Sequence, residues 1–283
     1  LAHVGSPDYL DAERQGAIDM ARAIRSPGST LKPVIYGLGF EAGLAHPETL
    51  IEDRPARFGL YVPKNFDHDF RGTVTIRHAL AQSLNIPAVR VLAAVGPERL
   101  MGRFRDIGLA PQLPAGAEAS LAVALGGVGL TLEDLAGLYA SLANGGAATP
   151  LGVRRGEAAS RVQPGAAPST AKPQLLSPLA AWYVADILKD APPPVSARSG
   201  RLAYKTGTSY GYRDAWAAGF DGRHTVVVWV GRPDASSVPG LSGRTAAAPI
   251  LFDAFQRIGE KRVPLPGAPA GVIRATGADL PAP

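Results

Sequence analysis

The chain has 283 residues, enough for one large domain or two smaller ones with a sizeable core. It contains no cysteine, which excludes disulfide bonds and cysteine-ligated metal sites, and no apolar run reaches the roughly 18 residues needed to span a bilayer. The net charge of +5 comes without the lysine and arginine runs typical of nucleic-acid binding, so we interpret it as a solvated basic surface and predict no nucleic-acid partner.

In chain order, the sequence first predicts a short strand and two helices. Residues 1–4 have the character of a strand end, so we expect the domain to begin upstream of residue 1. After Ser29 apolar residues recur at helical spacing over residues 31–38, with Pro33 tolerable in the first turn. Thr75 is predicted to cap a second helix that continues until Pro87 interrupts it.

The later part of the chain predicts three more helices and a sheet. The helices are expected from Thr131 to a stop at Gly145 and Gly146, over residues 176–188, and over residues 249–258. The strands are expected over residues 202–208, 215–220 and 225–230, with a hairpin turn at Asp221 and Gly222.

Helices followed by a late antiparallel sheet predict an α+β fold. We expect one domain over residues 1–263, with its N-terminal strand truncated, and a tail rich in proline and glycine over residues 264–283.

Three short motifs occur in a fixed order along the chain: Ser29-Thr30-Leu31-Lys32, Ser83-Leu84-Asn85 and Lys205-Thr206-Gly207-Thr208. A serine and a lysine three residues apart mean little alone, because Ser169 and Lys172 fit the same pattern. Context separates the two copies: Ser29 opens a helix, whereas Ser169 lies in a loop rich in proline and alanine.

The first motif predicts nucleophilic catalysis. A serine hydroxyl is a weak nucleophile until a base removes its proton, and a lysine one turn away acts as that base only when it is uncharged. The pKa of Lys32 must therefore fall, through burial and nearby positive charge, for which Lys205 is a candidate. Near the helix N-terminus, the Ser29 backbone N–H is suited to stabilise an oxyanion. The alternative is a helix cap beside a surface lysine.

The other two motifs predict polar groups in a shared cleft. Ser83 and Asn85 face the same way only if the helix breaks near them; the alternative is a helix C-cap. Lys205, Thr206 and Thr208 on a strand are suited to bind a carboxylate, with Gly207 allowing close backbone approach. A lysine that protects an exposed sheet edge is the alternative.

The ordered motifs resemble those of serine penicillin-recognising enzymes. The flanking sequences of residues 25–33, 63–89, 143–146 and 205–216 are similar to the transpeptidase modules of class A penicillin-binding proteins, and the resemblance extends from residue 1 to about residue 260. It implies the fold shared by penicillin-binding proteins and β-lactamases, an antiparallel sheet flanked by helices plus an all-helical subdomain.

The resemblance also implies a serine D,D-transpeptidase that cross-links peptidoglycan stem peptides and is inhibited by penicillin. Ser29 would attack the D-Ala-D-Ala amide, Lys32 would be the base, Ser83 would relay a proton and Asn85 would hold the donor peptide. The terminal carboxylate of the donor would bind Lys205, Thr206 and Thr208, beside Gly207, and the Thr208 N–H would complete the oxyanion hole. No cofactor or metal is expected.

The implied partners are a D-Ala-D-Ala donor, an amine acceptor and β-lactam antibiotics, at the periplasmic or extracytoplasmic face of the inner membrane. Any membrane anchor is expected outside this chain. The same motifs are shared by D,D-carboxypeptidases, β-lactamases and non-catalytic β-lactam-binding modules, which stay open as alternatives. Glycan polymerisation is not assigned, since the residues that resemble the family belong to the transpeptidase module.

One unrelated enzyme class also fits a short pattern. Residues 207–211 match the Gly-x-Ser-x-Gly elbow of hydrolases, with Ser209 as nucleophile, but that elbow requires a helix after the serine and strand-like residues follow here. The five histidines show no metal-ligand spacing.

Overall fold

The computed structural model describes residues 2–149, 151–152, 173–195, 197, 202–258 and 262–272. Its centre is an antiparallel sheet in the order β3-β4-β5. The strands are β3 (Ala203–Thr208), β4 (Asp214–Phe220) and β5 (Thr225–Gly231). The three predicted strands are confirmed, and the predicted turn lies in the connection between the paired residues Phe220 and Thr225.

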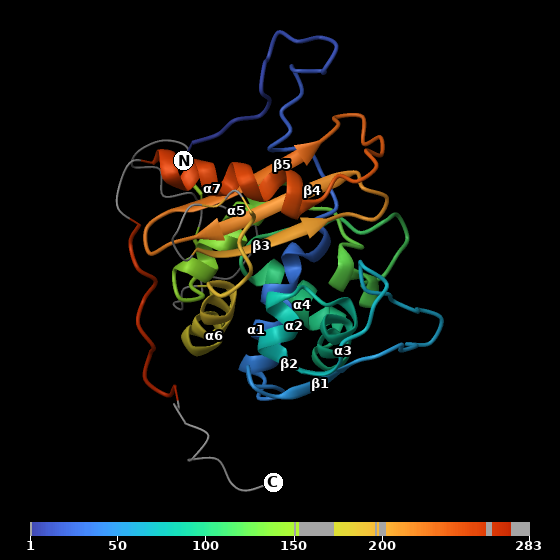
Figure 1. Cartoon of the computed structure of the whole chain (residues 1–283), viewed down its shortest axis with the longest axis vertical. Coiled ribbons are helices and arrows are strands. Elements are labelled where there is room, and N and C mark those ends of the chain that lie inside the picture. Colours follow the sequence, from blue (N-terminus) through green and yellow to red (C-terminus); the bar gives the residue numbers. More distant parts are fainter. Residues whose placement is uncertain are drawn as a thin grey trace, which may run out of the picture.

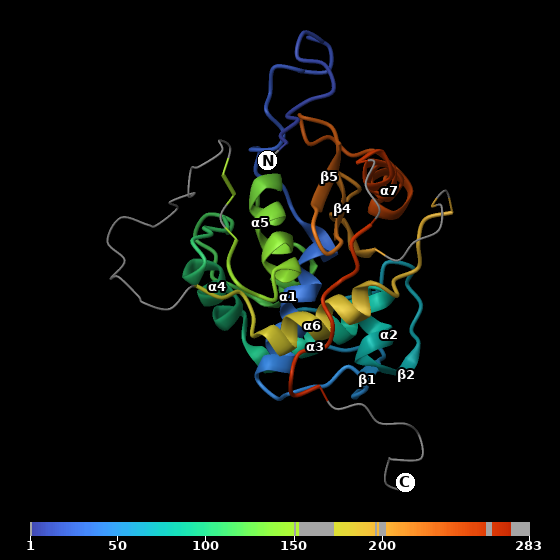
Figure 2. The same ribbon diagram turned by 90° about the vertical axis from the view of Figure 1, so that its left-hand side faces the viewer.

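Helices cover both faces of this sheet, as Figure 2 shows with the sheet seen edge-on. One face packs against α7 (Ala248–Arg257), where the rings of Tyr204 and Phe252 meet edge to face at 5.0 Å. The other face packs against α5 (Leu132–Ala143). Strand β4 is buried along its whole length, since it is the central strand and lies between these two layers.

Below the sheet, α1 (Lys32–Glu41) is the central helix, buried at every position except its last. It contacts α6 (Pro178–Leu188) and the helices of a second region, farther from the sheet (Figure 1). That region contains α2 (Ile76–Ala81), α3 (Asn85–Val95), α4 (Pro97–Asp106) and a hairpin of β1 (Leu50–Asp53) with β2 (Gly72–Thr75). The hairpin, α3 and α4 are additions to the predicted elements.

The helices predicted from apolar spacing are confirmed as α1, α5, α6 and α7. Together with the central antiparallel sheet they confirm the α+β class. In the part of the chain that the structure describes, no helix has both the length and the apolar composition that a membrane crossing requires.

The helix predicted from Thr75 to Pro87 is wrong in its extent. Thr75 does cap α2, since its Oγ1 accepts the N–H of His78 at 3.1 Å, but α2 ends at Ala81. Ser83 has a left-handed φ of 62°, which interrupts the helix, and Pro87 lies in the first turn of α3. Proline is tolerated there because first-turn N–H groups have no partner within the helix.

The strand predicted at the start of the chain is also wrong. Residues 2–4 have no regular secondary structure. His3 lies 2.9 Å from Asp19 and 3.1 Å from Glu133 of α5. Polar contacts to a loop and a helix therefore hold this segment, whereas the sheet ends at β5 in the described residues.

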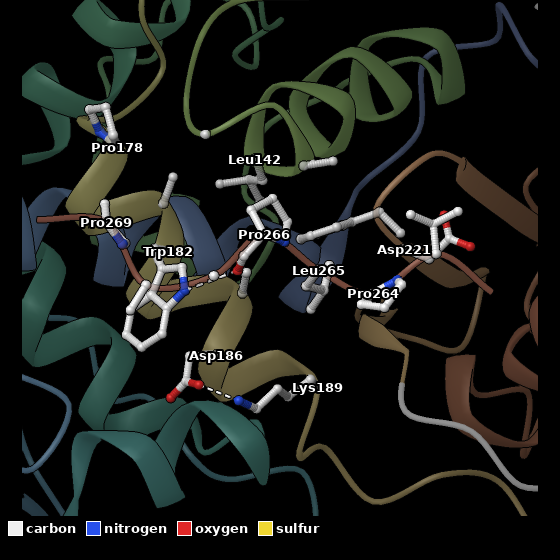
Figure 3. A pocket seen from close by; sticks show the side chains of 18 of the residues that line it. Leu142, Pro178, Trp182, Asp186, Lys189, Asp221, Pro264, Leu265, Pro266 and Pro269 are labelled. Carbon is white, nitrogen blue, oxygen red and sulfur yellow. Dashed lines mark hydrogen bonds and ion pairs between the residues drawn. The ribbon is translucent and has the colours of Figure 1, made fainter. Parts of the chain in front are cut away.

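Residues 262–269 run beside α6 and help to line a cavity of about 600 Å³ (Figure 3). Gly222 N donates to Val263 O at 2.9 Å, and Trp182 Nε1 donates to Pro266 O at 3.3 Å. Phe220, at the end of β4, forms part of the cavity wall. The cavity therefore lies at the end of the sheet where β4 turns into β5.

Helix α5 offers a direct test of local stabilisation. Thr131 Oγ1 accepts the N–H of Asp134 at 3.0 Å, while the Asp134 carboxylate accepts the N–H of Thr131 at 3.1 Å. We expect Thr131→Ala to lower the free energy of unfolding, measured by urea denaturation, by about 1 kcal/mol. Thr131→Ser keeps the acceptor oxygen and is the control; equal losses in the two variants would contradict a capping role.

Candidate active site

Ser29 lies in a tight turn that leads directly into the central helix. The turn is the 3₁₀ helix η1 (Gly28–Leu31), and α1 begins at the next residue, Lys32. The Lys32 N–H donates to the Ser29 carbonyl, so the two residues are related by one 3₁₀ turn and their side chains lie on the same side. The predicted proximity of Ser29 to a helix start is confirmed, with a 3₁₀ turn in between.

Two glycines allow this turn to touch strand β3. Gly28 has φ of 53°, and a Cβ there would lie 2.5 Å from the Thr208 carbonyl oxygen. A Cβ on Gly207 would lie 2.5 Å from the Pro27 carbonyl oxygen. Real Cβ atoms do not come so close, so the backbones of η1 and β3 meet only because both positions are glycine. The sequence predicted that Gly207 allows another backbone to come close, and in the structure that backbone belongs to Pro27 and η1.

The turn is fixed from several sides. Trp216 Nε1 donates to the Ser26 carbonyl at 2.8 Å, and the Tyr139 hydroxyl donates to the Thr30 carbonyl at 3.0 Å. Thr30, Trp216 and Tyr139 are fully or almost fully buried. Ser29 itself is half-buried, so the candidate nucleophile is reachable from solvent on a rigid support.

Lys32 is fully buried, at 0% exposure, and its Nζ donates to oxygen atoms of the second motif. The partners are Asn85 Oδ1 at 2.5 Å, the Ser83 carbonyl at 2.7 Å and Ser83 Oγ at 3.4 Å. Burial and the charge of Lys205 hold the pKa of Lys32 well below its usual value, partly opposed by Asp53. The alternative of a surface lysine is excluded, and the predicted causes of the low pKa are present.

Ser83 joins the first and third motifs. Its Oγ accepts a hydrogen bond from Lys205 Nζ at 2.7 Å and lies 3.4 Å from Lys32 Nζ. Lys32, Ser83 and Lys205 form what we call the lysine–serine cluster. The left-handed backbone of Ser83 turns the chain between α2 and α3, and this places a hydroxyl between two amine groups.

Lys205 is almost completely buried although β3 is an edge strand of the sheet. Its Nζ also donates to the Thr206 carbonyl at 2.8 Å. Burial lowers the pKa of Lys205 to about 7. The alternative of an exposed lysine protecting a sheet edge does not hold. Lys32 and Lys205 are both buried and both contact the Ser83 hydroxyl, so it is unfavourable for both amines to be charged at once. This arrangement favours an uncharged amine on one of the two lysines.

Asn85 begins α3, so the alternative of a helix C-cap does not hold either. Its Oδ1 accepts from Lys32, while its Nδ2 donates to the Lys64 carbonyl at 2.7 Å. Its backbone N–H donates to Asn65 Oδ1 at 2.7 Å. Asn85 is thus half-buried and held by three protein partners beside Lys32.

The two threonines of the third motif lie on the other face of β3 from Lys205, because side chains alternate along a strand. Both are half-buried. Thr208 Oγ1 accepts the N–H of Gly243 at 3.0 Å, so the hydroxyl proton of Thr208 can be donated to a ligand. Gly243 begins η3 (Gly243–Ala247), the π-helical turn that precedes α7.

Sequence reasoning missed two buried polar residues behind this site. Asp53 is fully buried at the end of β1 and accepts bonds from Asn65, which in turn bonds Asn85. Asn65 stood in one of the sequences that resemble the family, without a role. Nothing in the local pattern around Asp53 indicated burial, because β1 is only four residues long.

The structure tests one of the two competing serine sites. Ser209 is buried, its Oγ accepts the N–H of Asp214 at 2.9 Å, and strand β4 follows it where a hydrolase elbow requires a helix. Ser169 lies outside the described residues. Within the described chain no group of three or more metal-ligating side chains is placed to hold an ion. The cavity of Figure 3 is lined by none of the motif residues.

Comparison with known proteins identifies the family of this chain. Residues 1–254 match the family described as "Penicillin binding protein transpeptidase domain". The chain belongs to this family. It is 46% identical over 252 residues to penicillin-binding protein 1C of Escherichia coli K12, covering 88% of this chain and 31% of that protein. It is 31% identical over 300 residues to penicillin-binding protein 1A of Neisseria gonorrhoeae, covering 98% of this chain and 36% of that protein.

Solved structures of penicillin-binding proteins share the fold. Penicillin-binding protein 1A of Haemophilus influenzae matches with a TM-score of 0.71 and 21% identity, over 90% of this chain and 46% of that one. PonA1 of Mycobacterium tuberculosis in complex with penicillin V matches with a TM-score of 0.73 and 20% identity, over 92% of this chain and 77% of that one. The chain is thus a class A transpeptidase domain that spans about a third of the curated relatives it matches.

The low pKa of Lys205 makes the stability of this domain depend on pH. An unfolded lysine keeps its proton up to about pH 10.4, whereas folded Lys205 releases its proton near pH 7. Between these values the unfolded state binds more protons, so the free energy of unfolding rises with pH. This group contributes a slope of up to about 1.4 kcal/mol per pH unit.

We expect Lys205→Met to remove that part of the slope, because methionine fills similar space and does not titrate. Urea denaturation across this pH interval measures the change. Lys64→Met, which replaces an exposed lysine, is the matched control and should keep the wild-type slope. An unchanged slope in Lys205→Met would mean that Lys205 titrates like an unfolded lysine.

Proposed function

We propose that this domain is a serine D,D-transpeptidase, which cross-links peptidoglycan stem peptides through an acyl-enzyme on Ser29. The lysine–serine cluster supports the proposal, because Lys32 directly follows the turn that contains Ser29 and its Nζ lies 3.4 Å from Ser83 Oγ. Membership of the transpeptidase family supports it further.

In the proposed acylation, uncharged Lys32 accepts the proton of Ser29 Oγ while that oxygen bonds to the carbonyl carbon between the two D-alanines. The resulting oxyanion accepts hydrogen bonds from the N–H groups of Ser29 and Thr208, each worth about 2.7 to 4 kcal/mol. The amide C–N bond then breaks as Ser83 gives its proton to the leaving D-alanine nitrogen. Ser83 regains a proton from protonated Lys32, which lies 3.4 Å away.

In the second half-reaction the proton movements reverse. An amine of a second stem peptide attacks the acyl carbon, and its proton passes through Ser83 to Lys32. Protonated Lys32 then returns a proton to Ser29 Oγ as the ester C–O bond breaks. The enzyme ends as it began, which is the requirement for turnover.

The donor peptide is proposed to bind along β3. This strand pairs with β4 on one side, and within the described residues its other edge has no strand partner, so an extended peptide can add there. Its terminal carboxylate would lie near Lys205, Thr206 and Thr208. Because an adjacent anion favours the charged form of a lysine, substrate binding raises the pKa of Lys205 and keeps the proton off Lys32.

We place this activity at the extracytoplasmic face of the bacterial inner membrane, where cell-wall stem peptides are cross-linked. β-Lactams are the proposed inhibitors, since PonA1 with the same fold was solved in complex with penicillin V. Asn85 is proposed to release one of its present partners and hold the donor peptide.

The first test of this function is the position of the penicillin adduct. We expect mass spectrometry to find one penicillin per chain on the peptide that contains Ser29, because Ser29 is next to the proposed base. Ser29→Ala should abolish the adduct, whereas Ser209→Ala, at a buried serine whose Oγ accepts the Asp214 N–H, should retain it. An adduct that persists in Ser29→Ala would contradict the proposal.

A second test separates transfer from hydrolysis. We expect the penicillin adduct to persist for many minutes, because the sequence offers no deacylating glutamate by motif. With a stem-peptide donor and rising acceptor amine, the ratio of transfer product to hydrolysis product should increase. Rapid release of hydrolysed antibiotic would identify a β-lactamase, and D-alanine release that ignores the acceptor would identify a carboxypeptidase. An adduct without any turnover would indicate a binding module.

A further inference from the structure

A buried carboxylate stands behind the proposed base. Asp53, the last residue of β1, is 0% exposed. Its two oxygens accept bonds from Asn65 Nδ2 at 2.8 and 2.9 Å, and Oδ2 also accepts the Arg71 N–H at 2.8 Å. Within the described residues no cationic side chain forms an ion pair with it. A carboxylate without a direct counter-ion is costly to bury, so its negative charge must be compensated from farther away.

An unbroken series of hydrogen bonds connects Asp53 to Lys32. Asn65 donates to Asp53 through its amide nitrogen and accepts the Asn85 N–H through its amide oxygen at 2.7 Å. Asn85 Oδ1 in turn accepts from Lys32 Nζ at 2.5 Å. The series begins at Asp53 on β1, passes through the loop residue Asn65 to Asn85 at the start of α3, and ends at Lys32 on α1. It therefore links the region of β1 and α3 to the helix that contains the proposed base.

The buried charges around this series are few. Lys32 on α1 and Lys205 on β3 are buried, as is Tyr36 one turn after Lys32, whose pKa is raised by burial and by Asp53. Glu52 on β1, Arg71 on the loop and Arg90 on α3 are at least partly exposed. The buried groups around this series are thus two lysines and one carboxylate, while the other two buried aspartates, Asp214 and Asp221, lie at the start of β4 and just after its end. Around the series, one negative charge balances one of two possible positive charges.

We propose that Asp53 is a positioning residue for the transpeptidase reaction, acting through Asn65 and Asn85 to orient Lys32 and to balance one proton shared by Lys32 and Lys205. The inference rests on the proposed role of Lys32 as the base. It is consistent with the pKa of Lys32, which burial and Lys205 lower and Asp53 raises. Asp53 therefore keeps the base from becoming too weak to accept the Ser29 proton.

If Asp53 contributed to stability alone, a different result is expected. If Asp53 only held the loop of residues 53–71 in place, its replacement would lower stability without moving the pH dependence of acylation. Asparagine at this position keeps the size of the side chain and one acceptor oxygen, so Asp53→Asn removes the charge with little change in shape.

The test is the rate of acylation by a fluorescent penicillin as a function of pH. In Asp53→Asn we expect the midpoint of the rising limb to move down by about one pH unit, because the nearby negative charge that favoured the protonated base is gone. Tyr36→Phe is the matched control. It removes a buried hydroxyl without a hydrogen-bond partner in the described residues, one turn from Lys32, and should leave the midpoint unchanged.

A double variant keeps the test decisive if Asp53→Asn does not fold. Asp53→Asn combined with Asn65→Asp returns one carboxylate to the series, in a position bonded directly to the Asn85 N–H, and removes the bond that Asn65 Nδ2 donates to the Asp69 carbonyl. Because the charge is then nearer to Lys32, the midpoint should be at or above the wild-type value. Folded Asp53→Asn protein with a wild-type midpoint, or a double variant with a lowered midpoint, would overturn the inference.

Failure of the proposed function gives a different result. If wild-type protein forms no penicillin adduct, or if Lys32→Arg acylates at the wild-type rate, then Lys32 is not the base and the function is wrong. If wild type acylates and Lys32→Arg does not, but Asp53→Asn keeps the wild-type midpoint, only the inference about Asp53 fails.

Discussion

The site depends on the direct contact between the backbones of η1 and β3. Gly28 lies against Thr208 of β3, and Gly207 lies against Pro27 just before η1, so closely that a side chain at either glycine would collide with a carbonyl oxygen. This contact fixes the distance between the first and third motifs, because neither backbone can move apart without opening the core around Trp216 and Thr30. Ser29, the proposed nucleophile, is therefore positioned by close packing of the main chain.

Burial of the two lysines is the physical basis of the proposed base. Lys32 is fully buried, and Lys205 nearly so, and desolvation is the largest cause of the low pKa of each. The same burial weakens the fold, since a charged lysine must lose its proton or its solvation when the chain folds. Two such groups lower the stability of the domain, and the hydrogen bonds to oxygen atoms of Ser83 and Asn85 reduce that loss.

Much of the fold was predictable because it depends on local patterns. Apolar spacing located α1, α5, α6 and α7, and alternating or continuous apolar runs located the three strands. The second helix was misjudged because Pro87 is the stronger signal in the sequence, whereas the break comes from the left-handed backbone of Ser83. The hairpin of β1 and β2 is too short for a periodic signal, and Asp53 within it gave no indication of its burial.

The sequence by itself determined which residue types are present at the site, since Ser29, Lys32, Ser83 and Lys205 stand in ordered motifs that resemble one family. It also determined that Ser29 and Lys32 share one side of a turn, because their separation is local. Only the tertiary structure decided that Lys205 bonds Ser83 from 122 residues away and that Asn65 links Asp53 to Asn85. Those contacts, and the pKa values that follow from them, depend on which surfaces exclude water together, and no local pattern encodes that.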